Sequence, residues 1–306
     1  MRLKNSVYIL LTFLLFSCET TEKIDDFPLR PAKLVVNCFF NADSTWEFQV
    51  SKSLSVLDNA EFKLIKNATI SIFKEGELQT SFSSVGSDGW YRYSENLPEA
   101  GKEYSIKVTS PDFKDVLLAK DIVPVKPIIT NTKLFISDST FYNNGYFNYG
   151  YIAGAMELTI SDPENTHNYY ELELYALDSV FDYYSEPREF VQLQKRMLPI
   201  SSDDLAADKI SEISYSLLLN DYLFDGKEYK LSIDFSDYNA GRKKDYYISL
   251  KSITREGFLY RKTINEYLNS QNDPFSEPVI IYSNIENGLG IFSAFSQSVV
   301  AISTDF

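Results

Sequence analysis

Hydrophobic and polar residues alternate over short stretches from residue 33 to about residue 123, with turn-forming residues between the stretches. In residues 68–73 and 103–108, apolar and polar residues alternate one by one, so that every second residue is apolar. This pattern predicts strands with one buried and one solvated face. We expect strands at residues 33–40, 46–52, 68–74, 77–83, 90–93, 104–109 and 116–122. Short strands at this spacing, without a helical window between them, predict an antiparallel β-sandwich of immunoglobulin-like or transthyretin-like type.

Two prolines, Pro124 and Pro127, then interrupt the pattern. Proline cannot serve a central strand and stiffens a connection, so we expect a domain boundary here. The rest of the chain again alternates, and it predicts strands at residues 132–136, 156–161, 168–177, 190–198, 229–235, 245–253, 279–282 and 291–303. This predicts a mainly β protein in which a second antiparallel β-rich domain follows the first.

Apolar residues recur at helical spacing in one region only, residues 255–271. Tyr260, Ile264, Tyr267 and Leu268 form the apolar stripe of a helix that should cover a sheet face or edge, while Arg261, Lys262 and Glu266 should point outward. The second domain is therefore expected to carry one covering helix.

The first residues follow a different pattern. Basic residues precede an apolar run over residues 7–16, which is about half the length that a spanning helix needs. A positive start, a short apolar core and a small residue before the cut predict an export signal that is removed. Residues 15–18, LFSC, resemble the bacterial lipobox, with Phe16 in place of its usual small residue. We expect acylation of Cys18; an ordinary secretory signal with an incidental cysteine is the alternative.

Residues 19–31 hold charged and hydroxyl side chains, two prolines and little apolar surface, which is typical of a tether. Acidic residues behind an acylated cysteine resemble the signals that send lipoproteins of Bacteroidetes-type bacteria to the cell surface; a solvated spacer is the alternative. The expected organisation is a lipoprotein signal peptide (1–17), a tether (18–32), a β-sandwich domain (33–123), a proline linker (124–127) and a second β-rich domain (128–306).

The chain carries 29 basic and 43 acidic residues, a formal net charge of −14. Binding to nucleic acid or to an anionic membrane surface requires clustered lysine and arginine, so this balance argues against both. No second apolar stretch is long enough to span a bilayer, so lipid on Cys18 is the expected membrane attachment. Cys38 lies in an apolar strand, and we interpret it as a buried structural thiol.

Aromatic and amide side chains gather in residues 138–151, which the pattern predicts to be a loop. Aromatic faces beside amides can stack on a sugar ring or contact a protein partner, because tyrosine supplies contact area at low entropic cost. The candidate partner- or ligand-binding residues are Tyr142, Tyr146, Phe147, Tyr149 and Tyr151. A mobile loop, or one folded back on its own domain, is the alternative.

Metal and catalytic chemistry find little support. Residues 201–225 contain six carboxylates: Asp203, Asp204, Asp208, Glu212, Asp221 and Asp225. Their spacing is not that of an EF-hand loop, so we interpret them as solvated surface rather than as a calcium site. His167 is the sole histidine, which argues against a histidine-based triad or a multi-histidine metal site. Without a phosphate-cradling glycine loop either, we expect no cofactor and no enzymatic activity.

The last stretch carries a family resemblance. Residues 273–278, DPFSEP, precede residues 281–295, IYSNIENGLGIFSAF, where Asn287, Gly288 and Gly290 predict a tight turn with positive φ. With the lipobox, DSTW at 43–46, the proline linker, and DP and NYY at 162–170, this stretch resembles the Bacteroidetes outer-membrane lipoprotein family called domain of unknown function 4249. The resemblance covers essentially the whole mature chain.

The resemblance implies a location rather than a chemistry. Members of the family are typically outer-membrane lipoproteins encoded beside TonB-dependent receptors, and no catalytic residues are established that could be transferred. The expected function is therefore that of a lipid-anchored, non-catalytic accessory protein that captures a ligand or binds a partner in a TonB-dependent receptor system. The alternative is a surface structural or adhesion module without a transport role.

Overall fold

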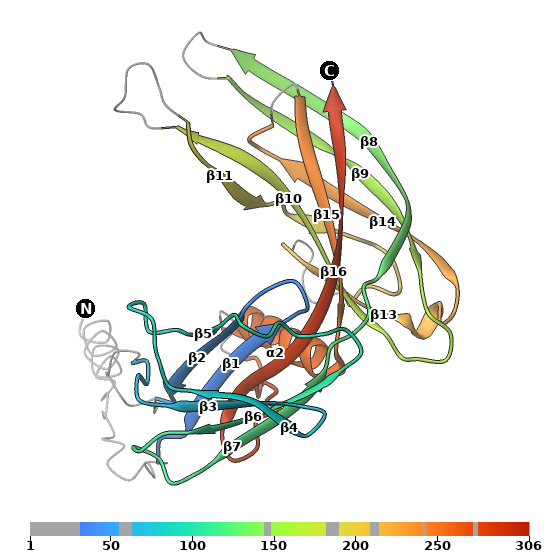
Figure 1. Ribbon diagram of the computed structural model, residues 1–306. Coiled ribbons are helices and arrows are strands. Elements are labelled where there is room, and N and C mark those ends of the chain that lie inside the picture. Colours follow the sequence, from blue (N-terminus) through green and yellow to red (C-terminus); the bar gives the residue numbers. More distant parts are fainter. Residues whose placement is uncertain are drawn as a thin grey trace, which may run out of the picture.

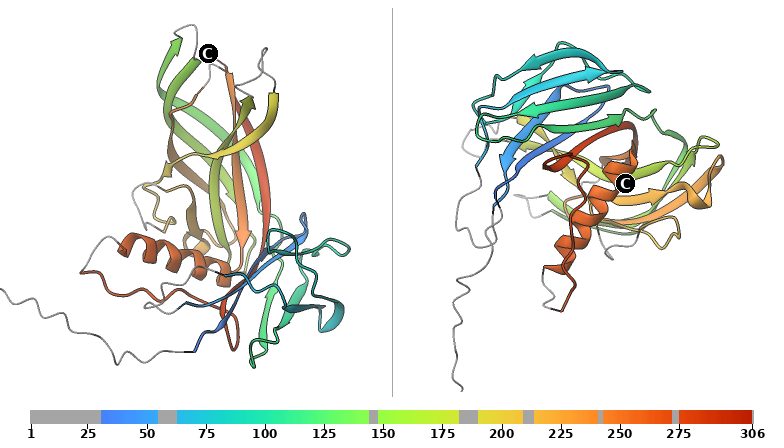
Figure 2. Two further views of the ribbon diagram at one scale, coloured as in Figure 1. Left: turned by 90° about the vertical axis from the view of Figure 1, so that its left-hand side faces the viewer. Right: turned by 90° about the horizontal axis from the view of Figure 1, so that it is seen from below.

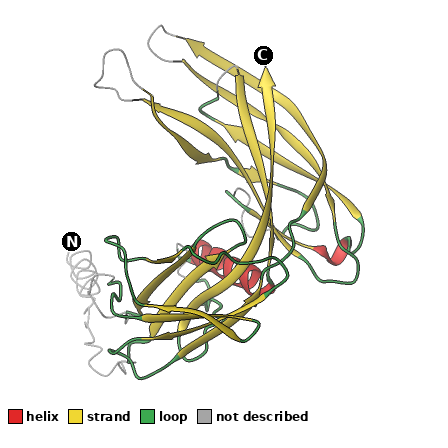
Figure 3. Ribbon diagram, in the orientation of Figure 1, coloured by secondary structure: helices red, strands yellow, loops and turns green. Residues whose placement is uncertain are grey.

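The computed structural model describes residues 31–54, 63–143, 148–181, 190–208, 214–240, 243–271 and 275–305. Strands dominate, and they form two stacked β-sandwiches with one α-helix at the junction (Figures 1 and 3). We call these sandwiches the N-terminal and the C-terminal lobe. The mainly β fold predicted from the alternating pattern is confirmed.

The N-terminal lobe contains the first seven described strands. They are β1 (Leu34–Phe40), β2 (Trp46–Lys52), β3 (Thr69–Lys74), β4 (Glu77–Phe82), β5 (Tyr91–Tyr93), β6 (Glu103–Thr109) and β7 (Leu117–Ile122). Each lies within one residue of its predicted bounds. The alternation that predicted them is also the burial pattern: every second side chain of β7, for example, is buried.

The C-terminal lobe is built on longer strands. They are β8 (Ile128–Asn143), β9 (Asn148–Ser161), β10 (Tyr169–Phe181), β11 (Phe190–Met197), β12 (Ile200–Ser201), β13 (Leu217–Asn220), β14 (Glu228–Asp237), β15 (Lys243–Ile253) and β16 (Leu289–Asp305), with a 3-10 helix η1 at Asp221–Leu223. Two short strands, β12 and β13, were not predicted. The strand predicted at residues 279–282 is wrong, since this segment has no strand partner and runs instead along the helix.

The last strand belongs to both lobes. The first part of β16 pairs in parallel with β1, from Val35 opposite Leu289 to Phe40 opposite Ala294. Its remainder pairs antiparallel with β15, from Ile253 opposite Phe295 onward. One sheet, in the order β11-β10-β15-β16-β1-β2-β5, therefore runs through the whole molecule, and a four-stranded sheet covers it in each lobe (Figure 1).

This sharing corrects the predicted domain organisation. The prediction assigned residues 128–306 to the second domain alone, but Ile285, Phe292 and Ala294 are buried in the core of the N-terminal lobe. The parallel pairing of β1 with β16 also departs from the purely antiparallel sandwich that we expected. Alternation gives the buried face of a strand but not its neighbour, so the sequence pattern could not reveal either feature.

Stacked aromatic rings form the centre of the N-terminal core. The Phe40 ring stacks on Trp46 at 4.7 Å and on Phe292 at 4.5 Å between ring centroids, so the last strand completes this stack. Cys38, on the same face of β1, is 1% exposed, and burial raises the pKa of its thiol. Its interpretation as a buried structural thiol is confirmed.

The turn that leads into β16 has the positive φ values predicted for it, at two of its three residues. Asn287 and Gly290 have φ values of 61° and 108°. A Cβ atom at Gly290 would lie 2.1 Å from the Val36 carbonyl oxygen, and one at Gly288 would lie 2.9 Å from the Leu34 carbonyl oxygen. Glycine thus allows β16 to lie close to β1 where their pairing begins.

Helix α2 (Arg255–Ser270) confirms the predicted helix and lies across the junction of the lobes (Figure 2). Its predicted covering stripe is wrong in part, since Tyr267 and Leu268 are 38% and 53% exposed. Thr254 caps it, because its hydroxyl oxygen accepts a hydrogen bond from the Gly257 amide. Arg261 was expected to point outward, but its Nε donates to the buried Glu171 at 2.9 Å and its guanidinium lies 4.6 Å from the Phe39 ring centre. The helix therefore contacts both lobes. Among the described residues, none of the helices has the length and apolar character needed to cross a membrane.

Candidate functional site

The aromatic region 138–151 is mainly a β-hairpin rather than the predicted loop. Strands β8 and β9 continue into it, with Thr140 opposite Tyr151 and Tyr142 opposite Tyr149. The backbone N–H and C=O groups of this region are paired between the two strands. The asparagine and glycine residues in the sequence suggested a turn, but they did not indicate how far the strands extend toward it. The hairpin lies at the end of the C-terminal lobe that is farthest from the N-terminal lobe (Figure 1).

Two of the five predicted site residues have described side chains. Tyr142 is 56% exposed, and the Tyr151 ring lies 5.1 Å from that of Tyr238. For Tyr149 only the backbone position in β9 is described. Tyr146 and Phe147 lie outside the described residues. Cys18, the predicted lipidation site, also lies outside them.

Tyr238 is an aromatic residue of this region that the sequence prediction missed. It is 73% exposed and follows β14, some ninety positions from the hairpin, so only strand order brings it to Tyr151. The Ala240 amide donates to the Gly150 carbonyl at 3.0 Å and holds this turn against β9. Exposed tyrosine rings grouped in this way offer amphipathic contact area to a sugar or a protein surface.

An open cleft of about 1060 Å³ lies between the two lobes. One wall is the outer face of β6 and β7, where Leu118 and Ile122 are 41% and 51% exposed. The other wall contains His167, Tyr169 and the start of helix α2. Residues from positions 73 to 286 line this cleft, so no local motif could have indicated it.

Asp121, on β7, anchors the floor of the cleft and is only 8% exposed. Its Oδ2 accepts hydrogen bonds from the Thr254 hydroxyl at 2.7 Å and from the Ala294 amide at 2.8 Å, and its Oδ1 accepts one from the Ile122 amide. It thereby connects β7 to the cap of α2 and to β16. In the sequence, Asp121 is a charged residue at a position of β7 where the alternation predicts a buried side chain. This position could have indicated its structural role.

Burial raises the pKa of Asp121 to about 6 from 3.8, although its hydrogen bonds favour the charged form. The folded protein therefore binds this proton more tightly than the unfolded chain, so this contribution to stability is full below about pH 4 and is lost as the pH rises through about 6. A difference of about two pKa units corresponds to about 3 kcal/mol.

Asp121→Asn should remove this pH dependence. We expect the free energy of unfolding of the wild type, relative to the variant, to fall by about 2 kcal/mol between pH 4 and pH 6.5. Urea titrations of both proteins across this range measure the difference, in which the titration of all other carboxylates cancels. A difference that stays constant with pH would contradict the assignment of this proton to Asp121.

Three carboxylates form the group that best fits a cation within the described part of the chain. Ligand oxygens of Asp162, Asp221 and Asp225 lie within 4.8 Å of one another. However, Asp162 accepts hydrogen bonds from the Tyr170 hydroxyl and the Gly226 amide, and Asp221 accepts one from the Asn168 amide at 2.6 Å. These bonds hold two loops together without a cation, so the arrangement has a structural explanation.

The other carboxylates of residues 201–225 do not join this group. Asp204 accepts from the Tyr229 hydroxyl at 2.5 Å, and Asp208 forms an ion pair with Lys262 at 2.7 Å. Asp203 is described but lies apart from the group, and Glu212 lies outside the described residues. The described carboxylates of residues 201–225 thus belong to separate contacts rather than to one group.

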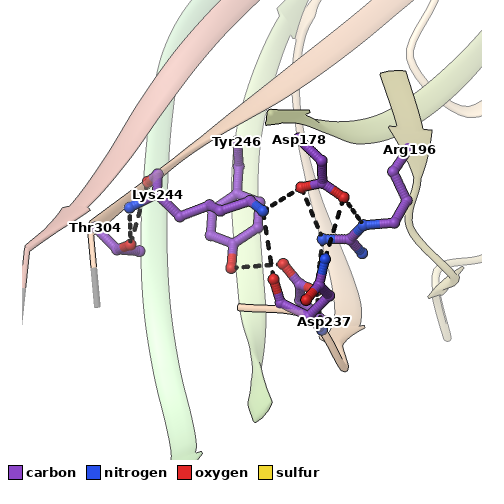
Figure 4. A network of polar contacts seen from close by, with 7 residues as sticks. Asp178, Arg196, Asp237, Lys244, Tyr246 and Thr304 are labelled. Atoms are coloured by element: carbon purple, nitrogen blue, oxygen red, sulfur yellow. Dashed lines mark hydrogen bonds and ion pairs between the residues drawn. The ribbon is translucent and has the colours of Figure 1, made fainter. Parts of the chain in front are cut away.

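A buried polar network lies inside the C-terminal lobe, near its far end (Figure 4). Arg196 Nη2 lies 2.8 Å from Asp237 Oδ1, and its Nε donates to Asp178 Oδ2 at 2.5 Å. Lys244 pairs with Asp178, and the Tyr246 hydroxyl donates to Asp237 at 3.1 Å. Because Asp237 is fully buried and every charge of the network has an opposite partner, loss of one partner would leave an uncompensated buried charge.

Fold and sites together define a two-lobed β-sandwich protein whose lobes share a strand and whose far end presents exposed tyrosines. A family model matches residues 19–299. The chain belongs to this family, which is described as Domain of unknown function (DUF4249). The resemblance noted in the sequence is thereby confirmed.

Comparison with curated proteins gives no match. Among solved structures, a β-glucuronidase from glycoside hydrolase family 2 is similar at a TM-score of 0.20 and 7% identity, over 90% of this chain and 20% of that one. The BSP domain of a biofilm-associated protein is similar at a TM-score of 0.18 and 8% identity, over 87% and 58%. The chain thus spans only part of these proteins, and similarity at this level supports no functional assignment.

Proposed function

We propose that this chain is a lipid-anchored outer-membrane or surface protein without catalytic activity. In this proposal it is an accessory component of a TonB-dependent receptor system, where it captures a ligand or binds the receptor. Family membership supports the system, and the lipobox at Cys18 supports the anchor. The absence of catalysis rests on the histidine content and on the carboxylates described above, which have structural hydrogen-bond or ion-pair partners.

The observation that carries the proposal is the distance between the anchored end and the aromatic end. Strand β1 begins in the N-terminal lobe, whereas the β8–β9 hairpin turns at the opposite end of the molecule (Figures 1 and 2). Strand β8 alone has 16 residues, a length of about 50 Å. An anchor before residue 31 would therefore present Tyr142, Tyr151 and Tyr238 to a partner well above the membrane surface.

Replacing the exposed tyrosines should separate the protein from its partner. We expect Tyr142→Ser with Tyr238→Ser to lower the amount of TonB-dependent receptor that co-purifies from mild-detergent outer membranes by at least tenfold. The matched control is Tyr215→Ser with Tyr222→Ser, since these tyrosines are 61% and 66% exposed elsewhere. Recovery of the wild type alone in several detergents would instead favour the structural or adhesion role.

The anchor has a separate test. Growth with a labelled fatty acid should label the wild type and Cys38→Ala, whereas Cys18→Ala should carry no label. Cys38 is the matched control because it is the only other cysteine and is buried. A labelled Cys18→Ala variant would contradict the lipobox interpretation.

A further inference from the structure

We infer that the end of helix α2 and residues 275–281 insert into the lipid surface that holds the anchor. Large apolar side chains are strongly exposed there: Phe275 is 94% exposed, Ile280 87%, Leu268 53%, Ile281 39% and Tyr267 38%. We call these five residues the apolar apex. The inference rests on the proposed function, because it takes the chain to be anchored through its N-terminal segment.

The two parts of the apolar apex, the end of α2 and the residues before Tyr282, lie along one another. The Tyr282 amide donates to the Thr263 hydroxyl at 2.9 Å, so the segment after α2 returns along the helix. Tyr267 lies one turn beyond Thr263 on the same face, which places it beside the residues that precede Tyr282. Helix end and returning segment therefore present their apolar side chains together.

The same segment ends where the anchored chain enters the fold. Its continuation forms the start of β16, and Leu289 lies directly opposite Val35 at the start of β1. Leu289 is itself 38% exposed. The entry of the N-terminal segment and the end of the apex segment are thus adjacent, on the side of the molecule away from the hairpin (Figure 2).

The fold holds this segment in place although it contains no helix or strand. The Asn284 side chain forms two hydrogen bonds with the Phe292 backbone, at 2.7 and 3.0 Å. Ile285 is buried, and the Asn287 side chain donates to the Val116 carbonyl at 3.2 Å. Residues 284–287 are therefore fixed to the fold, and the exposed Ile280 lies only a few residues before them.

The length of chain before the fold favours lipid as the occupant. Twelve residues lie between Cys18 and Pro31, and the chain from one to the other reaches at most about 45 Å even when fully extended. The start of β1, and with it the neighbouring apex segment, must therefore stay within this distance of the acyl chains. A second copy or a protein partner lacks any such constraint toward this surface.

The charge of the segment determines which lipid property matters. Residues 263–288 contain no lysine or arginine and four acidic residues. Attraction to anionic headgroups is therefore absent, and insertion must come from burial of apolar area. We expect it to occur on zwitterionic phosphatidylcholine and to be insensitive to salt.

Tryptophan at the apolar apex tests the insertion in the full-length, acylated protein. Ile280→Trp and Phe275→Trp are compared with Tyr238→Trp, which is also strongly exposed but lies at the hairpin end. Each protein is reconstituted into phosphatidylcholine vesicles with and without brominated acyl chains, and the wild-type signal of Trp46 and Trp90 is subtracted. We expect the new tryptophan at position 280 or 275 to be quenched at least fivefold more than the one at position 238.

The outcomes separate the inference from the proposed function. Protein that floats with the vesicles but shows equal or no quenching at the three positions overturns the insertion and leaves the anchor intact. A blue shift at position 280 without quenching would assign the apex to a protein contact and also overturn it. Protein that does not float contradicts both the anchor and the insertion.

Discussion

Phe292→Ala should lower the free energy of unfolding by about 3–5 kcal/mol, although the residue lies only fourteen positions before Phe306. Its ring is fully buried and stacks on Phe40 at 4.5 Å, with Trp46 behind it at 6.3 Å. Alanine would leave a cavity at the side of this stack, and the neighbouring strand β1 is held by pairing with both β2 and β16. The last strand is thus expected to be essential for the first sandwich.

Urea unfolding followed by tryptophan fluorescence measures this effect, because both tryptophans, Trp46 and Trp90, lie in the N-terminal lobe. Val299→Ala is the matched control on the same strand. It is 44% exposed, so we expect it to cost less than about 1 kcal/mol. A loss of under about 1 kcal/mol for Phe292→Ala would mean that the N-terminal lobe does not depend on β16.

Arg196→Met should destabilise the protein by about 3–5 kcal/mol, because it removes one partner of a buried charge network. Asp237 is fully buried and would keep only the Tyr246 hydroxyl and the Asn239 amide as hydrogen-bond donors in the described structure. An uncompensated buried carboxylate is costly even when neutral donors remain. The methylene stem of arginine is retained by methionine, so the change acts mainly on the charge.

Lys230→Met serves as the control for removal of a cation. Lys230 pairs with Glu157 at 2.7 Å but is 62% exposed, so its loss should cost no more than about 1 kcal/mol. Asp237→Asn combined with Arg196→Met should recover part of the loss, since the buried charge is then absent. Equal costs for Arg196→Met and Lys230→Met would show that the network adds no more than a surface ion pair.

Local sequence patterns predicted the elements of this fold well. Alternation gave the strands of the N-terminal lobe to within a residue, and apolar residues at helical spacing gave α2. Both patterns arise from the burial of one face of an element, a property that each segment expresses by itself. The error at residues 279–282 has a different origin, because this apolar run is not buried: Ile280 and Ile281 are 87% and 39% exposed.

The candidate sites were predictable only in part. Tyr142 and Tyr151 were found because aromatic residues cluster locally, whereas Tyr238 reaches Tyr151 only through the strand order of the C-terminal lobe. The cleft around Asp121 depends on residues from both lobes and from the shared strand. Contacts of this kind between residues far apart in sequence leave no periodic signal.

The sequence by itself determined the mainly β character, the position of most strands, the helix at residues 255–270, the acidic charge and the membership of the family. Only the tertiary structure decided that β16 completes both sandwiches and that Asp121 connects β7 to β16. It also decided that the segment of the apolar apex ends beside the start of β1. The physical reason is that hydrophobic alternation gives the buried face of each strand. Which strand lies next to it depends on packing over the whole chain.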